Sequence, residues 1–152
     1  MPTSLLNEHR EILSAVNKLL ALVRREPRPA MDEVSALRAH IGSLLLRHMH
    51  NEEALIIGPL LASGRLDDLP GGAAVLAEVR ELRTVYSRHV GQWTPQAISA
   101  DWSGYVAAAI HVAAHMQAMF AREERHLHLP ARQLLAPTAS PRPGAQVGPG
   151  AG

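Results

Sequence analysis

The stretch that decides the fold runs from Leu44 to Pro59 and reads LLLRHMHNEEALIIGP. His48 and Glu52 are four residues apart, so in a helix they lie one turn apart on the same face. Leucines lie near that face, which predicts that it points into a hydrophobic core. Burying an imidazole and a carboxylate is costly unless other polar groups or a bound cation satisfy them. The sequence therefore predicts a buried polar site in this part of the chain.

The composition fits one domain with a sizeable core, because the chain has 152 residues. Fifteen Lys and Arg residues against 14 Asp and Glu residues give a formal charge of +1, which argues against an electrostatic nucleic-acid binder. The absence of cysteine excludes disulfides, thiolate metal ligands and a cysteine nucleophile. No apolar run reaches the roughly 20 residues needed to span a membrane. The N-terminus turns polar too early for a signal peptide, so we expect a cytoplasmic protein.

Apolar residues recur at helical spacing in four segments, and no segment shows the alternation typical of a strand. The expected helices cover about residues 4–25, 31–58, 73–92 and 95–128, the last re-capped near Asp101. Prolines end the first two, and residues 60–72, which contain DDLPGG, form the longest internal break. Four amphipathic helices with short connections predict an all-α, antiparallel up-down four-helix bundle over residues 1–136. Residues 137–152, rich in Pro and Gly, are expected to form a disordered tail.

The two halves of the chain resemble each other. LLNEHREILSAV from Leu5 aligns with VLAEVRELRTVY from Val75, at an offset of 70 residues. HMHNEEALIIGP from His48 aligns with MFAREERHLHLP from Met119, at an offset of 71 residues. Both copies of this second segment place a double glutamate at the same distance before a proline. A duplication of this kind predicts two helix pairs related by pseudo-twofold symmetry.

The aligned halves supply different polar groups. The first half has two histidines and a glutamate, whereas the second has a valine, a methionine and a glutamate at the matching places. These positions are His9, His48, Glu52, Val79, Met119 and Glu123. A symmetric pair of sites would need four histidines and two carboxylates. The chain supplies two histidines and two carboxylates, so the predicted site has both carboxylates but only half of the histidines.

The motifs EHREI, HMHNEEALIIGPLL and a second EE before HLHLPA resemble the hemerythrin-like (HHE cation-binding) family, over about Leu5 to Pro130. In that family four helices hold a non-haem di-iron centre, with histidines as terminal ligands and two carboxylates that bridge the irons. The metal ligands that the resemblance implies here are His9, His48, Glu52 and Glu123.

The resemblance also implies two further histidines, but Val79 and Met119 stand at their positions. Two imidazoles with one or two carboxylates suit a single Fe(II), Mn(II) or Zn(II), so we expect mononuclear non-haem iron rather than a di-iron centre. Val79 and Met119 would form an apolar surface on the side of the metal site that lacks histidines. The spacing from the glutamates to the proline is one residue longer than the family pattern, which leaves Glu53 and Glu124 as rival ligands.

The function that the resemblance implies is binding of, or response to, oxygen, peroxide or nitric oxide at that metal. No separate acid–base machinery is visible, so the sequence leaves open whether the protein is an enzyme. The alternative is a metal-free descendant of the same fold that works as a binding or regulatory module. In that case His9, His48 and Glu52 would hydrogen-bond one another in the core.

A relocated site is a third hypothesis. His111 and His115 are an i, i+4 pair, and His89 lies on the expected inner stripe of the preceding helix. Together they could hold a metal or a haem at another level of the bundle, with His40 as a further candidate. His89 and His115 are the two expected to face inward. His40 and His111 lie off the inner stripes, which favours surface positions for both.

The remaining histidines and glutamates are expected on solvated faces or at helix ends. They are His50, His126, His128, Glu8, Glu53 and Glu124. Any of the three glutamates could also accept a hydrogen bond from an imidazole that binds the metal.

Overall fold

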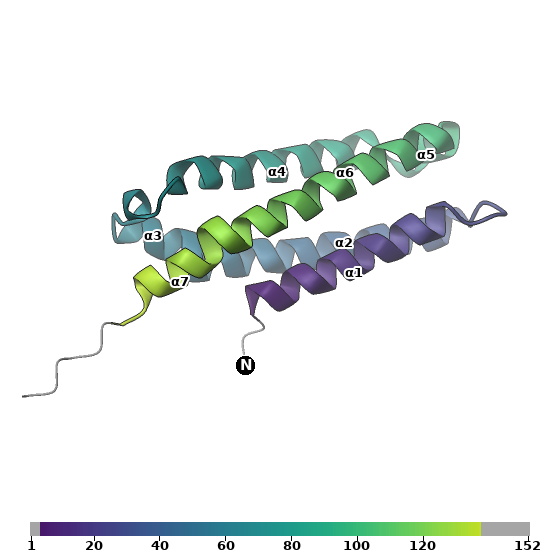
Figure 1. The fold of residues 1–152 in the computed structure, drawn as a ribbon. Helices are drawn as coiled ribbons and strands as arrows, with labels where there is room; N and C mark the ends of the chain where they lie inside the picture. Colours follow the sequence, from purple (N-terminus) through teal and green to yellow (C-terminus); the bar gives the residue numbers. More distant parts are fainter. Residues whose placement is uncertain (1–3, 138–152) are drawn as a thin grey trace, which may run out of the picture.

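The computed structural model describes residues 4–137, and every regular element in that range is a helix (Figure 1). The long helices have 19 to 22 residues each. They are α1 (Leu5–Val23), α2 (Met31–Glu52), α4 (Gly72–Gln92) and α6 (Trp102–Glu123). The all-α class predicted from the sequence is confirmed for this range. The predicted tail lies, from residue 138 onward, outside the described residues, as do residues 1–3.

Shorter elements extend or connect the long helices. They are η1 (Glu53–Ile57), α3 (Gly58–Ala62), η2 (Leu66–Asp68), α5 (Pro95–Ala100), η3 (Glu124–His128) and α7 (Leu129–Leu135). The long helices run along one another with their connections at alternate ends, α1 against α2 and α4 against α6 (Figure 1). α1 also contacts α6, which links the two pairs. None of the helices between residues 4 and 137 is long and apolar enough to cross a membrane.

Side-chain caps begin three of the helices. The hydroxyl of Ser4 accepts a hydrogen bond from the Asn7 amide at the start of α1. Thr94 caps α5 in the same way, and the carboxylate of Asp101 caps α6. These bonds satisfy amide groups that have no partner within the first turn of a helix. The predicted re-capping near Asp101 is confirmed, and it separates α5 from α6.

Two of the predicted helix ends are wrong. The helix expected to end at Pro59 continues to Ala62, and the one expected to end at His128 continues to Leu135. A π-helical segment, η1 or η3, precedes the proline in each case. A proline ring clashes with the carbonyl four residues earlier in an α-helix, and the wider π turn relieves that clash by shifting the hydrogen bonds by one residue. The helix can therefore run on past each proline.

The buried polar side chains occupy a level between two apolar clusters. The larger cluster includes Ile12, Leu44, Leu45, Met116 and Phe120, and the smaller includes Leu5, Ile56, Ile57, Val79 and Leu127. Along α1, α2 and α6 and their extensions, the buried residues His9, His48, Glu52 and Glu123 fall between members of the two clusters. The core therefore packs against this polar level from both sides.

We expect Ile12→Ala to lower the free energy of unfolding by about 2–5 kcal/mol, because Ile12 is 1% exposed and its truncation leaves a cavity in the larger cluster. Leu129→Ala is the matched control, since Leu129 is 58% exposed and should cost less than about 0.5 kcal/mol. Urea denaturation followed by circular dichroism measures both. Equal losses for the two variants would contradict the assignment of the core.

Candidate metal centre

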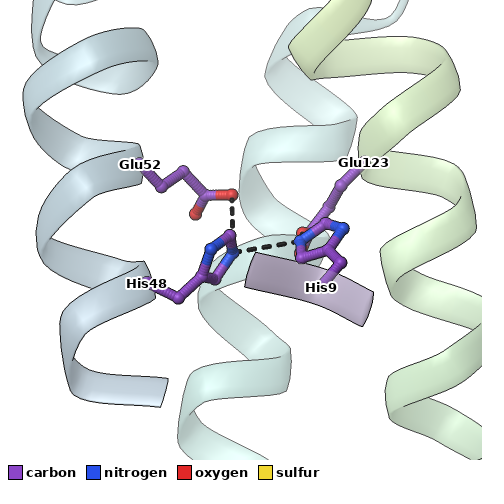
Figure 2. A group of neighbouring side chains, drawn as sticks. All are labelled: His9, His48, Glu52 and Glu123. Atoms are coloured by element: carbon purple, nitrogen blue, oxygen red, sulfur yellow. Dashed lines mark hydrogen bonds and ion pairs between the residues drawn. The ribbon is translucent and has the colours of Figure 1, made fainter. Parts of the chain in front are cut away.

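Four side chains that the sequence singled out meet in the core. His9 comes from α1, His48 and Glu52 from α2, and Glu123 from the last turn of α6 (Figure 2). Each is 3% exposed or less. One nitrogen or oxygen atom of each lies within 4.8 Å of the others. The structure therefore gathers all four predicted ligands into one buried group that could hold a metal ion.

Aromatic packing fixes the orientation of His9. Its imidazole lies parallel to the Phe120 ring, with the ring centroids 3.9 Å apart and the planes 2° from parallel. Phe120 belongs to the larger apolar cluster, three residues before Glu123 on α6. The stacking leaves the ring edge, with its two nitrogens, free to make polar contacts in the plane of the imidazole.

Carboxylates hold the outer nitrogen of each imidazole. Nδ1 of His9 lies 2.9 Å from Oε1 of Glu124, and Nδ1 of His48 lies 2.8 Å from Oε2 of Glu8. The side-chain amide of Asn51 donates to the other oxygen of Glu8. An ionised carboxylate can only accept a hydrogen bond, so each Nδ1 carries the proton and donates. A histidine that binds a metal through Nε2 typically has its Nδ1 tied in this way.

When both imidazoles are neutral, their inner nitrogens therefore present lone pairs to each other. Nε2 of His9 lies 3.0 Å from Nε2 of His48 (Figure 2). Two neutral imidazoles with protonated Nδ1 atoms cannot hydrogen-bond through these atoms, because both are acceptors. Oε2 of Glu123 lies 3.2 Å from Nε2 of His9 and makes no hydrogen bond within residues 4–137. Acceptor atoms converging on one point require a shared proton or a cation.

Glu52 is the most heavily engaged carboxylate of the group. Its Oε2 lies 2.7 Å from Nε2 of His128 and 3.7 Å from Nε2 of His48. Its Oε1 accepts a hydrogen bond of 2.9 Å from Arg83, a half-buried residue of α4. Burial would raise the pKa of Glu52, but hydrogen bonds and charge from His128 and His48 outweigh it and hold that pKa far below 4.5. Glu52 therefore stays ionised.

The carboxylates also control the charge of His48. Burial lowers the pKa of a histidine, yet hydrogen bonds with Glu52 and Glu8 and the charges of Glu52 and Glu123 raise the pKa of His48 above 6.5. Without a metal, His48 therefore keeps its extra proton to a higher pH than a free histidine does, and that proton can lie between the two Nε2 atoms. A metal that binds Nε2 must displace that proton.

The sequence placed two members of this network wrongly. His128 was expected at a solvated position, but it is 5% exposed, and Glu8, expected at the surface, is 1% exposed. The π turn η3 brings His128 inward five residues after Glu123. The signal for this turn was the extra residue between the double glutamate and the proline. Glu8 and Glu124 do contact Nδ1 atoms of His48 and His9, which are the hydrogen bonds to imidazoles that the sequence allowed for them.

The two positions where the resemblance implies further histidines hold buried apolar residues, as expected. Val79 is 2% exposed and Met119 6% exposed, so both are buried. A cavity of about 70 Å³ lies beside His48, Glu52 and Glu123, with Val79 and Phe120 in its walls. Such a volume holds one or two water-sized molecules. Glu53, a rival ligand from the sequence, is exposed and lies 3.9 Å from Arg83.

The relocated site at His89, His111 and His115 is not formed. His111 and His115 are exposed on α6, whereas His89 is half-buried and lies near the Tyr105 ring. Over residues 4–137, no second group of three or more possible ligands comes together. The i, i+4 pair faces solvent because the inner stripe of α6 passes through Ala109, Ala113 and Met116. The expected surface positions of His40 and His111 are confirmed, and that of His115 inside is wrong.

No protein-family model, curated protein sequence or solved structure matches this chain. The interpretation of the site therefore depends on its own geometry and donor chemistry.

We expect Glu8→Gln to weaken metal binding by about 10- to 100-fold, because it removes the negative charge that polarises His48 through Nδ1. Glu11→Gln is the matched control on the same helix, since Glu11 pairs with Arg47 at the surface. Competition with a coloured chelator for Zn(II) measures both affinities. Equal affinities for the two variants would show that Glu8 does not support the site.

The pH dependence of stability should reverse when metal is added. A raised pKa in the folded protein means that His48 stabilises the metal-free fold below pH 6.5, and this contribution is lost as the pH rises through the raised pKa. Glu52 contributes above pH 4.5 and loses its contribution as the pH falls toward its depressed pKa. Stabilisation by a metal instead grows with pH, because the ion competes with protons for the imidazoles.

Thermal melts from about pH 6 to about pH 8.5 would therefore slope downward with a chelator present, and the gain in melting temperature from added Zn(II) would rise over the same range. His48→Gln should flatten both slopes, whereas His50→Gln, at an exposed position, should leave them unchanged. A gain from Zn(II) that is independent of pH would argue against imidazole ligation.

Proposed function

We propose that this chain is a hemerythrin-like protein whose antiparallel up-down four-helix bundle binds one iron ion through His9, His48, Glu52 and Glu123. The observation that carries the proposal is the 3.0 Å approach of two imidazole Nε2 atoms whose Nδ1 atoms are both held by carboxylates. Such an arrangement leaves lone pairs directed at a common point. A cation there would satisfy both imidazoles and the unpartnered oxygen of Glu123 together.

The donor set favours a divalent first-row metal. Imidazole nitrogens and carboxylate oxygens suit Fe(II), Mn(II) and Zn(II), and the chain has no cysteine to favour softer or thiolate-bound metals. One ion fits better than two, because Val79 and Met119 occupy the positions where the second half would supply histidines. The nearby His128 could be a further nitrogen ligand. Its Nε2 contacts Glu52, and its Nδ1 has no hydrogen-bond partner within the described range.

The natural ligand that we propose is oxygen, peroxide or nitric oxide. When bound, iron would supply a redox-active centre with affinity for such molecules. The cavity of about 70 Å³ next to His48 and Glu52 accommodates a molecule of that size and little more. Val79 and Phe120 give this cavity apolar walls. Arg83, whose guanidinium donates to Glu52, also lines it and carries a positive charge. The residues thus select for small ligands by size and polarity.

A metal-free module is the second candidate. It is favoured by the contacts of Glu52, which already satisfy both of its oxygens through Arg83 and His128. Protonation of His48 could then reconcile the two facing Nε2 atoms without any ion. In this case the polar level would serve to specify the packing of the helices, and the protein would act through its surface.

Metal analysis distinguishes the two candidates. We expect the purified protein to contain about one iron per chain, and His48→Ala to remove it, because that change deletes one of only two imidazoles in the set of four. His50→Ala, two residues away at an exposed position, should keep the iron. Circular dichroism would verify that both variants fold.

Two irons per chain would mean that the ligand set is larger than we propose. No metal, even after reconstitution with Fe(II) without oxygen, would favour the metal-free module. An optical spectrum recorded before and after exposure to air would show whether the bound metal responds to oxygen.

A further inference from the structure

A second and much larger cavity adjoins the small one beside His48 and Glu52. Its volume is about 750 Å³, and its walls come from α1, α2, α4 and α6. Apolar side chains make most of the lining, among them Leu19, Ile41, Leu45, Met49 and Met116. This volume is in the range of sites that bind small organic molecules. The metal centre needs no such space, so the cavity calls for its own explanation.

Tyr105, a lining residue of this cavity, carries a buried hydroxyl that is unsatisfied among the described residues. Its side chain lines the wall, the residue is 0% exposed, and its hydroxyl has no hydrogen-bond partner within residues 4–137. Leaving a buried hydroxyl unpaired costs free energy that a core residue such as phenylalanine would avoid. Burial raises the pKa of Tyr105 above 10.0, so the hydroxyl keeps its proton and can donate.

Arg38 supplies a positive charge to the cavity, close to Tyr105. One of its nitrogens donates to the Trp93 carbonyl at 2.6 Å, and the guanidinium carbon lies 5.7 Å from the centroid of the Tyr105 ring. Within the described residues, no carboxylate lies within ion-pair distance of Arg38, although other arginines of the chain have such partners. A guanidinium offers five donors, so those that Trp93 does not use are available to an anion.

The other titratable lining groups add no competing charge. Burial, and then the charge of Arg38, lower the pKa of His89 below 6.5, so this imidazole is neutral near pH 7. Burial raises the pKa of Tyr86, which is therefore also neutral. Arg38 is thus the fixed charge that faces this cavity. The cavity combines a long apolar wall with one cation and one free hydroxyl donor.

We propose that this cavity binds a long-chain carboxylate, with its carboxylate on Arg38 and Tyr105 and its hydrocarbon chain along the apolar wall toward Met49 and Met116. Arg38 and Met49 both line the cavity and lie eleven residues apart on α2, which corresponds to roughly 16 Å of helix. An extended chain of moderate length spans such a distance. A single cation and hydroxyl match one carboxylate, whereas a phosphate dianion would require more donors.

Titration calorimetry with dodecanoate below its micelle concentration tests the proposal on the full chain. We expect saturable binding of one dodecanoate per chain and no binding of dodecyltrimethylammonium, which has the same chain length and the opposite charge. Arg38→Gln should weaken the binding of dodecanoate at least tenfold, because it removes the charge. Arg88→Gln, at an exposed position of α4 outside the lining, should leave the affinity unchanged.

Two further variants keep the test decisive if Arg38→Gln folds poorly. Gly42→Leu should abolish binding by filling the cavity, since Gly42 lines it and a Cβ there meets only the Tyr86 hydroxyl at 3.9 Å. Leucine also favours a helix more than glycine does, so the fold should tolerate it. Tyr105→Phe should weaken binding several-fold while raising the melting temperature of the ligand-free protein, because it removes an unsatisfied hydroxyl.

Several results would overturn the proposal. Equal affinity for the two detergents, or unchanged binding of dodecanoate in Gly42→Leu, would show that any binding is non-specific or occurs elsewhere. A dimer that Gly42→Leu dissociates, without dodecanoate binding, would show that a second copy of the chain covers this face. A haem absorbance band that His89→Ala removes, again without dodecanoate binding, would assign the cavity to haem. His48→Ala should leave dodecanoate binding intact, so failure of the metal proposal would not affect this result.

Discussion

The arrangement of the core depends on two imidazoles that are each held from behind by a carboxylate. Glu124 and Glu8 hold the Nδ1 atoms of His9 and His48, and the two Nε2 atoms face each other at 3.0 Å. This contact joins α1 to α2, and the oxygens of Glu52 and Glu123 complete it from α2 and α6. The apolar clusters above and below offer these groups no hydrogen-bond partners. A core that concentrates acceptors in this way is stable only if a proton or a cation is supplied.

Two π turns explain how the chain builds this polar level on helices that continue beyond it. Each turn begins directly after a glutamate of the group, at Glu53 after Glu52 and at Glu124 after Glu123. The extra residue changes which side chains face inward beyond the turn, and in the second half it turns His128 toward Glu52. In the first half the corresponding segment contributes Ile56 and Ile57 to the smaller apolar cluster instead. The same backbone device therefore produces a polar network on one side and hydrophobic packing on the other.

The sequence predicted the helical class because it depends on local spacing, and it predicted the four side chains through the repeat and the resemblance of its motifs to a known metal-binding family. Helical periodicity places His48 and Glu52 on one face, and the similarity of the two halves identifies Glu123. Spacing could not predict His128 or Glu8 inside, since a π turn rotates the first and the position of Glu8 depends on contacts with His48 and Asn51. The inward position expected for His115 was wrong because small alanines, rather than the histidine pair, form the inner stripe of α6. The large cavity arises from packing among four helices, which no single helical pattern contains.

The second half of the chain contributes apolar walls to both cavities. Val79 stands where the aligned first half has His9, and it forms a wall of the small cavity beside the glutamates. Leu45, Met49, Tyr86, Ser87 and Met116 line this small cavity and the large one alike, so the two spaces adjoin. An apolar second half thus does more than remove ligands: it places hydrocarbon surface directly against a polar centre. A molecule in the large cavity would face the candidate metal centre across side chains of methionine and tyrosine, whose flexibility and size would govern access to it.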